Sequence, residues 1–300
     1  MPRLHAMFVH AHPDDESSKG AATMARYASE EHRVSVVTCT DGGRGHVLNP
    51  ALDRPEVRER LASRRAAELA AALEVLGVTD HWWLGYPDSG HVPGWDGRTP
   101  LDDSQHLADD CFARSQREPA VARLVGLIRR GQPDVLVTYP PADDCPHPDH
   151  RRTHEITVRA FEEAADPDAH PGTGAPWQPR KLYYTVVSNP NRTRALHAAC
   201  QRHGIASPFD GCKSASEDPD PSTTFVEVGA HLEARAAALR AHASQVEPNG
   251  PWFAVPTWVI AAAYPYEAFV LARSRVATSV PEDDLFAGLR GADVVGSAVG

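Results

Sequence analysis

The sequence predicts an α/β fold: a Rossmann-like, mainly parallel sheet with helices on both faces, plus a smaller C-terminal α+β part. Short apolar runs alternate with longer amphipathic stretches over residues 1–190. The runs are apolar without strict alternation, which is typical of strands buried between two helical layers. Gly, Pro and Asp gather between the runs, as expected of connecting loops. Regular strand–helix alternation of this kind favours a parallel sheet.

Five apolar runs predict the strands and four amphipathic stretches predict the helices that join them. The expected strands are residues 4–9, 34–38, 81–84, 135–139 and 182–187. The expected helices are residues 21–29, 57–76, 120–130 and 153–164. Further along, we expect a strand at 223–228, an Ala-rich helix at 230–243 and an aromatic-containing segment that ends near Arg275.

Chain length and composition suggest how these elements are grouped. A chain of 300 residues is longer than most single domains. We expect a Rossmann-like core at 1–190, a smaller part packed on it at 191–280 and a loose tail at 281–300.

Charge and cysteine content exclude several functions. Forty acidic against thirty basic side chains give a net charge of −10, and basic residues do not cluster. Nucleic acid and anionic membranes are therefore not expected as partners. The five cysteines are scattered and form no C-x-x-C pair. Together with the absence of an apolar leader, this predicts a reducing, cytoplasmic location.

Two His-Pro-Asp motifs follow separate predicted strands. His12-Pro-Asp-Asp-Glu16 comes after strand 4–9, and His147-Pro-Asp-His150 lies eight residues beyond strand 135–139. Functional groups collect beyond the carboxyl ends of parallel strands. One such motif alone is more typical of a turn. Two of them offer the nitrogen and oxygen ligands of a catalytic zinc, whose charge offsets the clustered carboxylates.

Other catalytic signatures are missing from the chain. H-E-x-x-H and G-x-S-x-G do not occur, and no G-x-G-x-x-G follows the first strand. These absences disfavour a zincin, a serine hydrolase and a dinucleotide enzyme.

The paired motifs A-H-P-D-D and H-P-D-H resemble the zinc-dependent LmbE/PIG-L deacetylase family. Within it, the chain is similar nearly end to end to the amidases of mycothiol S-conjugates. The stretches that carry this likeness are residues 10–23, 48–51, 181–184, 240–243 and 271–275. The resemblance implies Zn²⁺ held by His12, Asp15 and His150. It also implies Asp14 as general base, His147 as an imidazolium that stabilises the oxyanion, and Asp149 as the residue that orients His147.

The residues also suggest a substrate-binding set. Arg65 falls on an apolar helical stripe, so either Glu68 or a substrate oxygen is its expected partner, with a snorkelling position as the alternative. The resemblance places Arg65 and Asp88 against the inositol-bearing sugar. Lys19 is a candidate for a substrate polar group, and an exposed first-turn lysine is its alternative.

Four positions depart from the family pattern. Gly43 and His46 replace the two glutamates of G-E-R-G-E, Pro140 replaces an aspartate, and Cys145 replaces a tyrosine two residues before His147. A thiol is a weaker hydrogen-bond donor than a phenol. These changes predict a specialised relative in which His46 and Cys145 line the substrate site.

Two further predictions concern residues outside the motifs. His242 is expected to be a packed or capping histidine. Trp252 and Trp258 are expected to be ordinary packing residues, with a wall for the apolar part of a conjugate as the alternative.

The function expected from the sequence is a zinc amidase. It would cleave a mycothiol S-conjugate to glucosaminyl-inositol and an N-acetylcysteine S-conjugate, in a role specialised for a biosynthetic conjugate. The alternatives are a sugar N-deacetylase and a catalytically silent conjugate-binding relative. The expected partner is a small-molecule thiol conjugate, and a homo-oligomer is left open.

Overall fold

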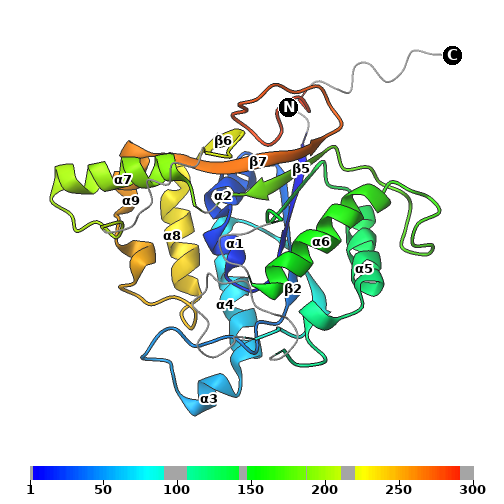
Figure 1. The fold of residues 1–300 in the computed structure, drawn as a ribbon, viewed down its shortest axis with the longest axis horizontal. Helices are drawn as coiled ribbons and strands as arrows, with labels where there is room; N and C mark the ends of the chain where they lie inside the picture. Colours follow the sequence, from blue (N-terminus) through cyan, green and yellow to red (C-terminus); the bar gives the residue numbers. More distant parts are fainter. Residues whose placement is uncertain (1–2, 91–106, 142–146, 187, 211–219, 291–300) are drawn as a thin grey trace.

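The computed structural model describes residues 3–90, 107–141, 147–186, 188–210 and 220–290 (Figure 1). Its centre is a seven-stranded sheet with the order β3-β2-β1-β4-β5-β7-β6. The first five strands in this order run parallel, and β7 is antiparallel to both of its neighbours. The strands are β1 (His5–His10), β2 (Arg33–Thr40), β3 (Asp80–Tyr86), β4 (Val135–Thr138), β5 (Lys181–Thr185), β6 (Thr224–Glu227) and β7 (Tyr266–Ser274).

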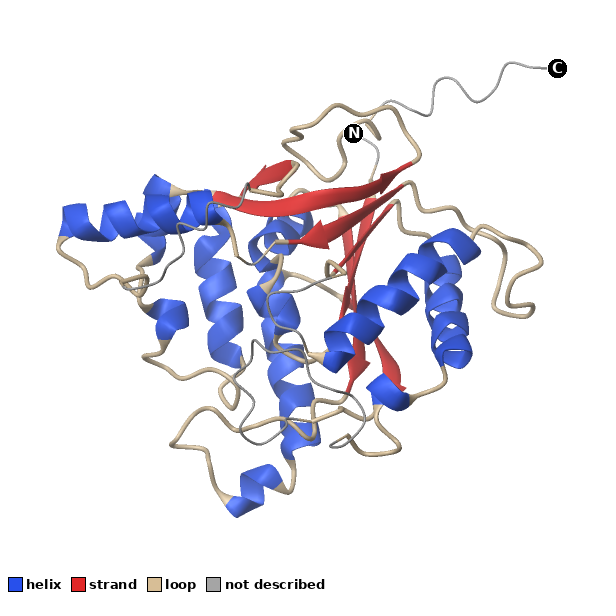
Figure 2. Cartoon of the chain, viewed as in Figure 1, coloured by secondary structure: helices blue, strands red, loops and turns tan. Residues whose placement is uncertain are grey.

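Helices cover both faces of the sheet (Figure 2). One face carries α1, α2, α4 and α8, and the other carries α5 and α6 (Figure 1). The α-helices are α1 (Asp15–Ser18), α2 (Ala21–Ser29), α3 (Pro55–Arg58), α4 (Leu61–Leu76), α5 (Arg117–Gly131), α6 (Pro148–Glu163), α7 (Pro190–His203), α8 (Leu232–Ala241) and α9 (Thr257–Ala263).

Alternating side chains of the central strand supply two apolar cores. Ala6 and Phe8 pack under α2 and α4, whereas Met7 and Val9 pack under α5 and α6. Successive side chains of a strand point to opposite faces, so β1 is apolar throughout. This two-sided burial explains the unbroken apolar runs of the sequence and confirms the predicted α/β class.

The sheet order creates a switch point between β1 and β4. The chain leaves β1 toward β2 on one side, and it leaves β4 toward β5 on the other. In open α/β sheets such a point forms a crevice at the carboxyl ends of the strands. Both His-Pro-Asp motifs therefore begin at this crevice.

Some predicted elements differ from those observed. The expected helix 57–76 is two helices, because α3 ends at Arg58 and α4 begins at Leu61. Helices α7 and α9 were not expected. Strand β7, from the C-terminal part, joins the same sheet as β5, and the division of the chain at residue 190 stays a prediction.

The expected loose tail is wrong for residues 281–290. Leu285, Phe286 and Leu289 are fully buried in the core beside α2. Lys181 Nζ lies 2.6 Å from Glu282 Oε1, and both side chains are buried. Apolar residues three or four apart were present in this segment, and they pack against the sheet edge.

Two simpler expectations can be compared with the described residues. Cys39, Cys111 and Cys200 are free and buried. No helix among the described ranges combines the length and the apolar character needed to span a membrane.

Candidate active site

The two motifs meet at the switch point. Asp14 is the N-cap residue just before α1, and His147 is the N-cap residue just before α6. Strands β1 and β4 are paired neighbours, so the loops that follow them lie side by side. The sheet therefore brings together residues that are more than 130 positions apart, as in the contact of His12 with Asp149, which are separated by 137 positions.

Three buried side chains form a plausible metal-binding set. The donor atoms of His12, Asp15 and His150 all lie within 4.8 Å of one another. Asp15 stands between the two imidazoles, with its Oδ2 3.4 Å from His12 Nδ1 and its Oδ1 3.5 Å from His150 Nε2. Two nitrogens and one carboxylate are the ligands of many catalytic zinc sites, which keep a further position for water. The residues present fit such an ion.

The other ring nitrogen of His12 faces two more carboxylates. His12 Nε2 lies 3.1 Å from Asp149 Oδ2 and 3.5 Å from Asp88 Oδ1. A metal-binding histidine commonly donates its second N–H to a carboxylate, which fixes the ring and its tautomer. His12, Asp88, His147 and Asp149 also lie within the same 4.8 Å limit. In that set the two carboxylates already accept backbone N–H groups, from Gly90 and Ser89.

Asp149 does not orient His147 as predicted. Its carboxylate accepts from the backbone N–H of Ser89 at 3.0 Å and from the Ser89 hydroxyl, and it holds His12. The carboxylate is 3.9 Å from His147 Nδ1. The backbone N–H of Asp149 donates to that nitrogen instead, at 3.1 Å, because His147 caps the start of α6.

The surroundings of His147 favour a neutral ring, whereas the resemblance implies an imidazolium, and that role stays a prediction. Burial and the nearby charge of His12 lower the pKa of His147 to about 3. Because Nδ1 accepts a hydrogen bond from Asp149, the ring proton must lie on Nε2, which faces the carbonyl of Gly90 at 3.2 Å. His147 thus presents an N–H donor at Nε2.

Asp15 is held by more groups than the metal motif alone predicts. Lys19 Nζ lies 2.6 Å from its Oδ1, and the Tyr139 hydroxyl donates to its Oδ2 at 2.8 Å. Burial alone would raise the pKa of Asp15, but Lys19 and His150 hold it well below its usual range. Only 10% of the Lys19 side chain is accessible, which excludes the alternative of an exposed lysine. Tyr139, which also stacks on His150, was missed as a functional residue.

Asp14 combines an unusual backbone with a perturbed carboxyl group. Its φ of 127° lies in the left-handed region, which a residue other than Gly rarely adopts. Its N–H donates to Glu16 Oε2 at 2.9 Å, and burial raises the pKa of its carboxyl group against the effect of Arg65. Strained residues with shifted pKa values cluster at functional sites.

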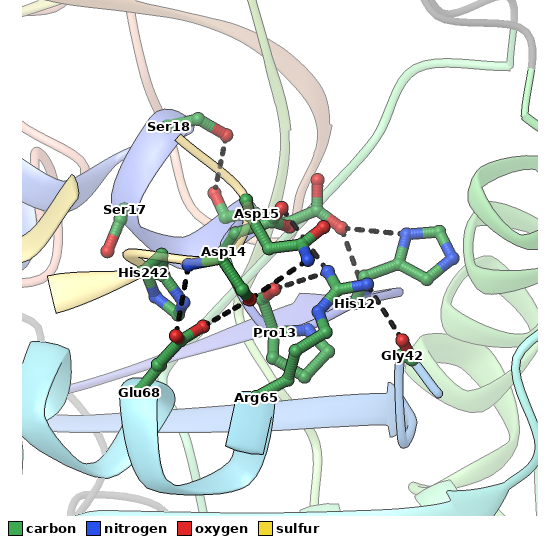
Figure 3. Close-up of polar contacts among 12 residues, drawn as sticks. His12, Pro13, Asp14, Asp15, Ser17, Ser18, Gly42, Arg65, Glu68 and His242 are labelled. Atoms are coloured by element: carbon green, nitrogen blue, oxygen red, sulfur yellow. Dashed lines mark hydrogen bonds and ion pairs between the residues drawn. The ribbon is translucent and has the colours of Figure 1, made fainter. Parts of the chain in front are cut away.

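Arg65 reaches from α4 to the motif loop, as Figure 3 shows. Its guanidinium donates to the carbonyls of Pro13 at 2.6 Å and Gly42 at 3.0 Å, and it lies 3.2 Å from Asp14 Oδ2. Arg65 is 3% exposed, which excludes the snorkelling alternative. The expected pair with Glu68 is wrong, since Glu68 binds Arg64.

The remaining predicted residues lie around one cleft of about 370 Å³, although only some reach its interior. The lining includes Arg65, Asp88, Lys19, His46 and Trp252 beside the metal-binding set. Asp88 is buried and accepts from the backbone of Gly90 and Arg44, whereas His46 is exposed. Trp252 stands at the rim with 43% exposure, which favours the alternative of a cleft wall. Cys145 lies outside the described residues.

The fold and site can now be compared with known proteins. Residues 7–161 match the family described as PIG-L, GlcNAc-PI de-N-acetylase. A mycothiol S-conjugate amidase of Streptomyces coelicolor is 46% identical over 295 residues, which cover 96% of this chain and 98% of the relative. The chain belongs to the PIG-L/LmbE family.

Two further comparisons extend this result. A 1D-myo-inositol 2-acetamido-2-deoxy-alpha-D-glucopyranoside deacetylase of Streptomyces avermitilis is 40% identical, with 96% of this chain and 98% of the relative covered. The solved structure of N,N'-diacetylchitobiose deacetylase from Pyrococcus horikoshii superposes with a TM-score of 0.61 at 17% identity, covering 89% of this chain and 83% of that one. Family membership makes this chain a hydrolase of the deacetylase and amidase group.

Proposed function

We propose that this protein is a zinc-dependent amidase of mycothiol S-conjugates. The observation that carries the proposal is the His12, Asp15 and His150 donor set next to Asp14, in one cleft. The nearly full-length likeness to a mycothiol S-conjugate amidase supports this substrate class. The products would be glucosaminyl-inositol and an N-acetylcysteine S-conjugate.

The general base of the proposed reaction is Asp14. A zinc ion, when bound, supplies Lewis acidity and lowers the pKa of a water molecule at the site. Asp14 takes a proton from the attacking water, whose oxygen bonds to the amide carbon. Asp14 then returns this proton to the leaving nitrogen as the C–N bond breaks, so one carboxyl group serves both steps. Burial raises the pKa of this carboxyl group, which makes it a stronger base.

The proposed oxyanion donor is His147. Its Nε2–H faces the carbonyl of Gly90 at 3.2 Å, at the wall of the cleft. An amide oxygen placed there would compete with Gly90 for this proton. Because the backbone N–H of Asp149 holds Nδ1, the donor remains aimed at the cleft without a change of tautomer. Losing one such donor typically lowers the rate on the order of 100-fold.

We assign the two parts of the substrate to the two ends of the cleft. Arg65, Asp88 and His46 lie together around the loop after β2, and we assign the sugar and inositol hydroxyls to that end. Gly43 and His46 leave this loop without the two glutamates expected from the family pattern. Trp252 and Lys19 bound the opposite end, where the thiol-linked part would lie.

One assay separates this function from its alternatives. The zinc-loaded protein is given a mycothiol S-conjugate and, separately, N-acetylglucosaminyl-inositol. Release of glucosaminyl-inositol from the mycothiol S-conjugate is the expected result. Hydrolysis of N-acetylglucosaminyl-inositol alone, to acetate and glucosaminyl-inositol, would favour the deacetylase, which is the second candidate because of the relative from Streptomyces avermitilis. Stoichiometric zinc with no hydrolysis of either would favour a silent binding protein. A cytoplasmic location and small-molecule partners remain part of this proposal.

A further inference from the structure

A second cavity of about 420 Å³ adjoins the metal cleft. It lies among α7, α8, α9 and the start of β7, and the two cavities share Ser18, Lys19 and Trp252 in their walls. Helices α7 and α9 lie close to α8 on one side of the molecule (Figure 1). A ligand that extends past Trp252 from the metal-binding residues would enter this second cavity.

Two guanidinium groups line this cavity without an ion-pair partner in the part of the chain that the structure describes. Arg192 comes from α7 and Arg235 from α8. In that part, neither guanidinium donates a hydrogen bond or lies within 4.0 Å of a carboxylate oxygen, and Arg235 stacks 5.8 Å from the centre of the Trp252 ring. The nearby carboxylate of Glu267 already accepts from Thr23 N at 2.8 Å and Thr23 Oγ1 at 2.7 Å.

The two arginines also act on each other. Burial and the charge of Arg235 lower the pKa of Arg192 to about 10, and burial lowers the pKa of Arg235. The charge of Glu267, in the same cavity wall, acts in the opposite direction on both arginines without cancelling the decrease. Two like charges held together in a half-enclosed cavity are unfavourable unless an anion lies between them.

A third donor faces the same cavity. The hydroxyl of Tyr264 is buried and has no hydrogen-bond partner among the described residues. Buried polar groups are nearly always hydrogen-bonded, so an unpartnered hydroxyl indicates a missing acceptor. Apolar side chains form the rest of the wall: Leu196, Phe209, Val255, Ile260 and Phe269.

We propose that this cavity binds a carboxylate carried by the S-linked group of the conjugate, in a subsite formed by Arg192, Arg235 and Tyr264. The planar guanidinium matches a carboxylate with two parallel hydrogen bonds. The inference rests on the proposed amidase function for the identity of the ligand. The carboxylate that hydrolysis creates forms beside His12 and Asp15, so the anion in this cavity belongs to the S-linked group. The apolar wall fits a hydrocarbon part next to the charge.

A pair of matched ligands tests this subsite. The zinc-loaded protein is titrated with S-(4-carboxybenzyl)-N-acetylcysteine and with its neutral 4-carbamoylbenzyl analogue, and both affinities are measured by calorimetry. The same two S-linked groups are then compared as mycothiol conjugates by their kcat/KM values. The variants are Arg192→Gln, Arg235→Gln and Tyr264→Phe, and the control is Arg194→Gln, which removes an arginine of α7 that bonds to Asn191.

The expected result is a preference for the acid of at least tenfold in the wild type and in the control. The preference falls about tenfold in each arginine variant and less in Tyr264→Phe, because a charge-assisted hydrogen bond is roughly twice as strong as a neutral one. Equal affinities in the wild type, or an unchanged preference in both arginine variants, would overturn the subsite. If the acid binds preferentially but no conjugate is hydrolysed, the subsite stands and the amidase function fails. Thermal unfolding of each variant confirms that it is folded.

Discussion

His242 Nε2 lies 2.6 Å from Glu16 Oε1, and both side chains are fully buried. Glu16 uses its other oxygen to accept the backbone N–H of Asp14 at 2.9 Å. The pair therefore fixes the peptide that carries the proposed general base, and Figure 3 shows His242 beside that peptide. Burial alone would raise the pKa of Glu16, but His242 lowers it to about 2, whereas Glu16 raises the pKa of His242.

This pair predicts a defined pH dependence of stability. The pKa of Glu16 is lower in the folded chain, at about 2, than its usual 4.5, so its contribution is present above pH 4.5 and is lost as the pH falls toward 2. The pKa of His242 is raised, so its contribution is present below pH 6.5 and is lost at higher pH, above its folded pKa. In Glu16→Gln, the loss of unfolding free energy as the pH falls from 4.5 toward 2 should be smaller than in the wild type by about 3 kcal/mol, as measured by urea unfolding. If the two proteins lose the same unfolding free energy over this pH range, Glu16 and His242 do not form a charged pair.

Replacing the proposed base should separate metal binding from turnover. Asp14→Asn keeps the shape of the side chain, and Asn tolerates a positive φ, so the backbone of the loop is retained. We expect kcat to fall by a factor of about 100 or more while the zinc content per chain is unchanged. Metal analysis and steady-state kinetics measure the two quantities. Turnover within twofold of the wild type would remove Asp14 from this role.

Metal binding should be visible as thermal stabilisation. Zinc at 100 times its Kd would stabilise the chelator-treated protein by about 2.7 kcal/mol, because the unfolded chain lacks the assembled site. His150→Ala should lose most of this shift in Tm, whereas His197→Ala, on α7, should keep it. An equal shift in the two variants would place the metal elsewhere. Activity should disappear with the chelator and return with zinc.

The position of Arg65 depends on a glycine. A Cβ at Gly42 would lie 2.7 Å from the guanidinium carbon of Arg65, and the φ of Gly42 is +64°. Gly42→Ala should therefore displace Arg65, lower kcat/KM and cost about 1–3 kcal/mol beyond the backbone strain. Gly172→Ala is the control, because its φ is +84° but no atom lies within 4 Å of the added carbon. Similar losses in both variants would mean that backbone strain alone accounts for the effect.

The segment at 281–290 should contribute to stability as part of the core. Phe286 is fully buried against Tyr27, with ring centres 4.6 Å apart. Phe286→Ala is expected to cost about 3–5 kcal/mol in urea unfolding, because it leaves a cavity. Val280→Ala, at a position that is 57% exposed, should change stability little. A small loss for both would restore the loose tail that the sequence predicts.

Local sequence signals predicted the centre of the fold well. Strands β1, β2, β4 and β5 are buried on both faces, so their apolar runs are long and unbroken. Helix α7 gave a weaker signal, because it buries only Leu196, Ala199 and Cys200 among its described residues. The signals that mark this helix lie at its ends, where Asn189 caps its start before Pro190 and Gly204 follows its last residue.

The donor set was predictable because each motif is local and follows a strand. The side chains that hold those donor atoms in place were harder to predict. Tyr139 reaches Asp15 across 124 positions, and His242 reaches Glu16 across 226. Such pairs depend on how helices and strands pack, which a single sequence does not encode locally. The same holds for Asp149, whose carboxylate was expected at His147 and is found at His12.

The contact between Glu16 and His242 joins an early part of the polypeptide to a late one. During synthesis the ribosome releases the N-terminal motif first, and domains generally begin to fold in that order. Until α8 emerges and docks, Glu16 has no imidazole to offset its charge. Nascent chains would therefore lack an anchored Asp14, and hydrolytic competence would arise only after His242 has left the ribosome and docked on Glu16.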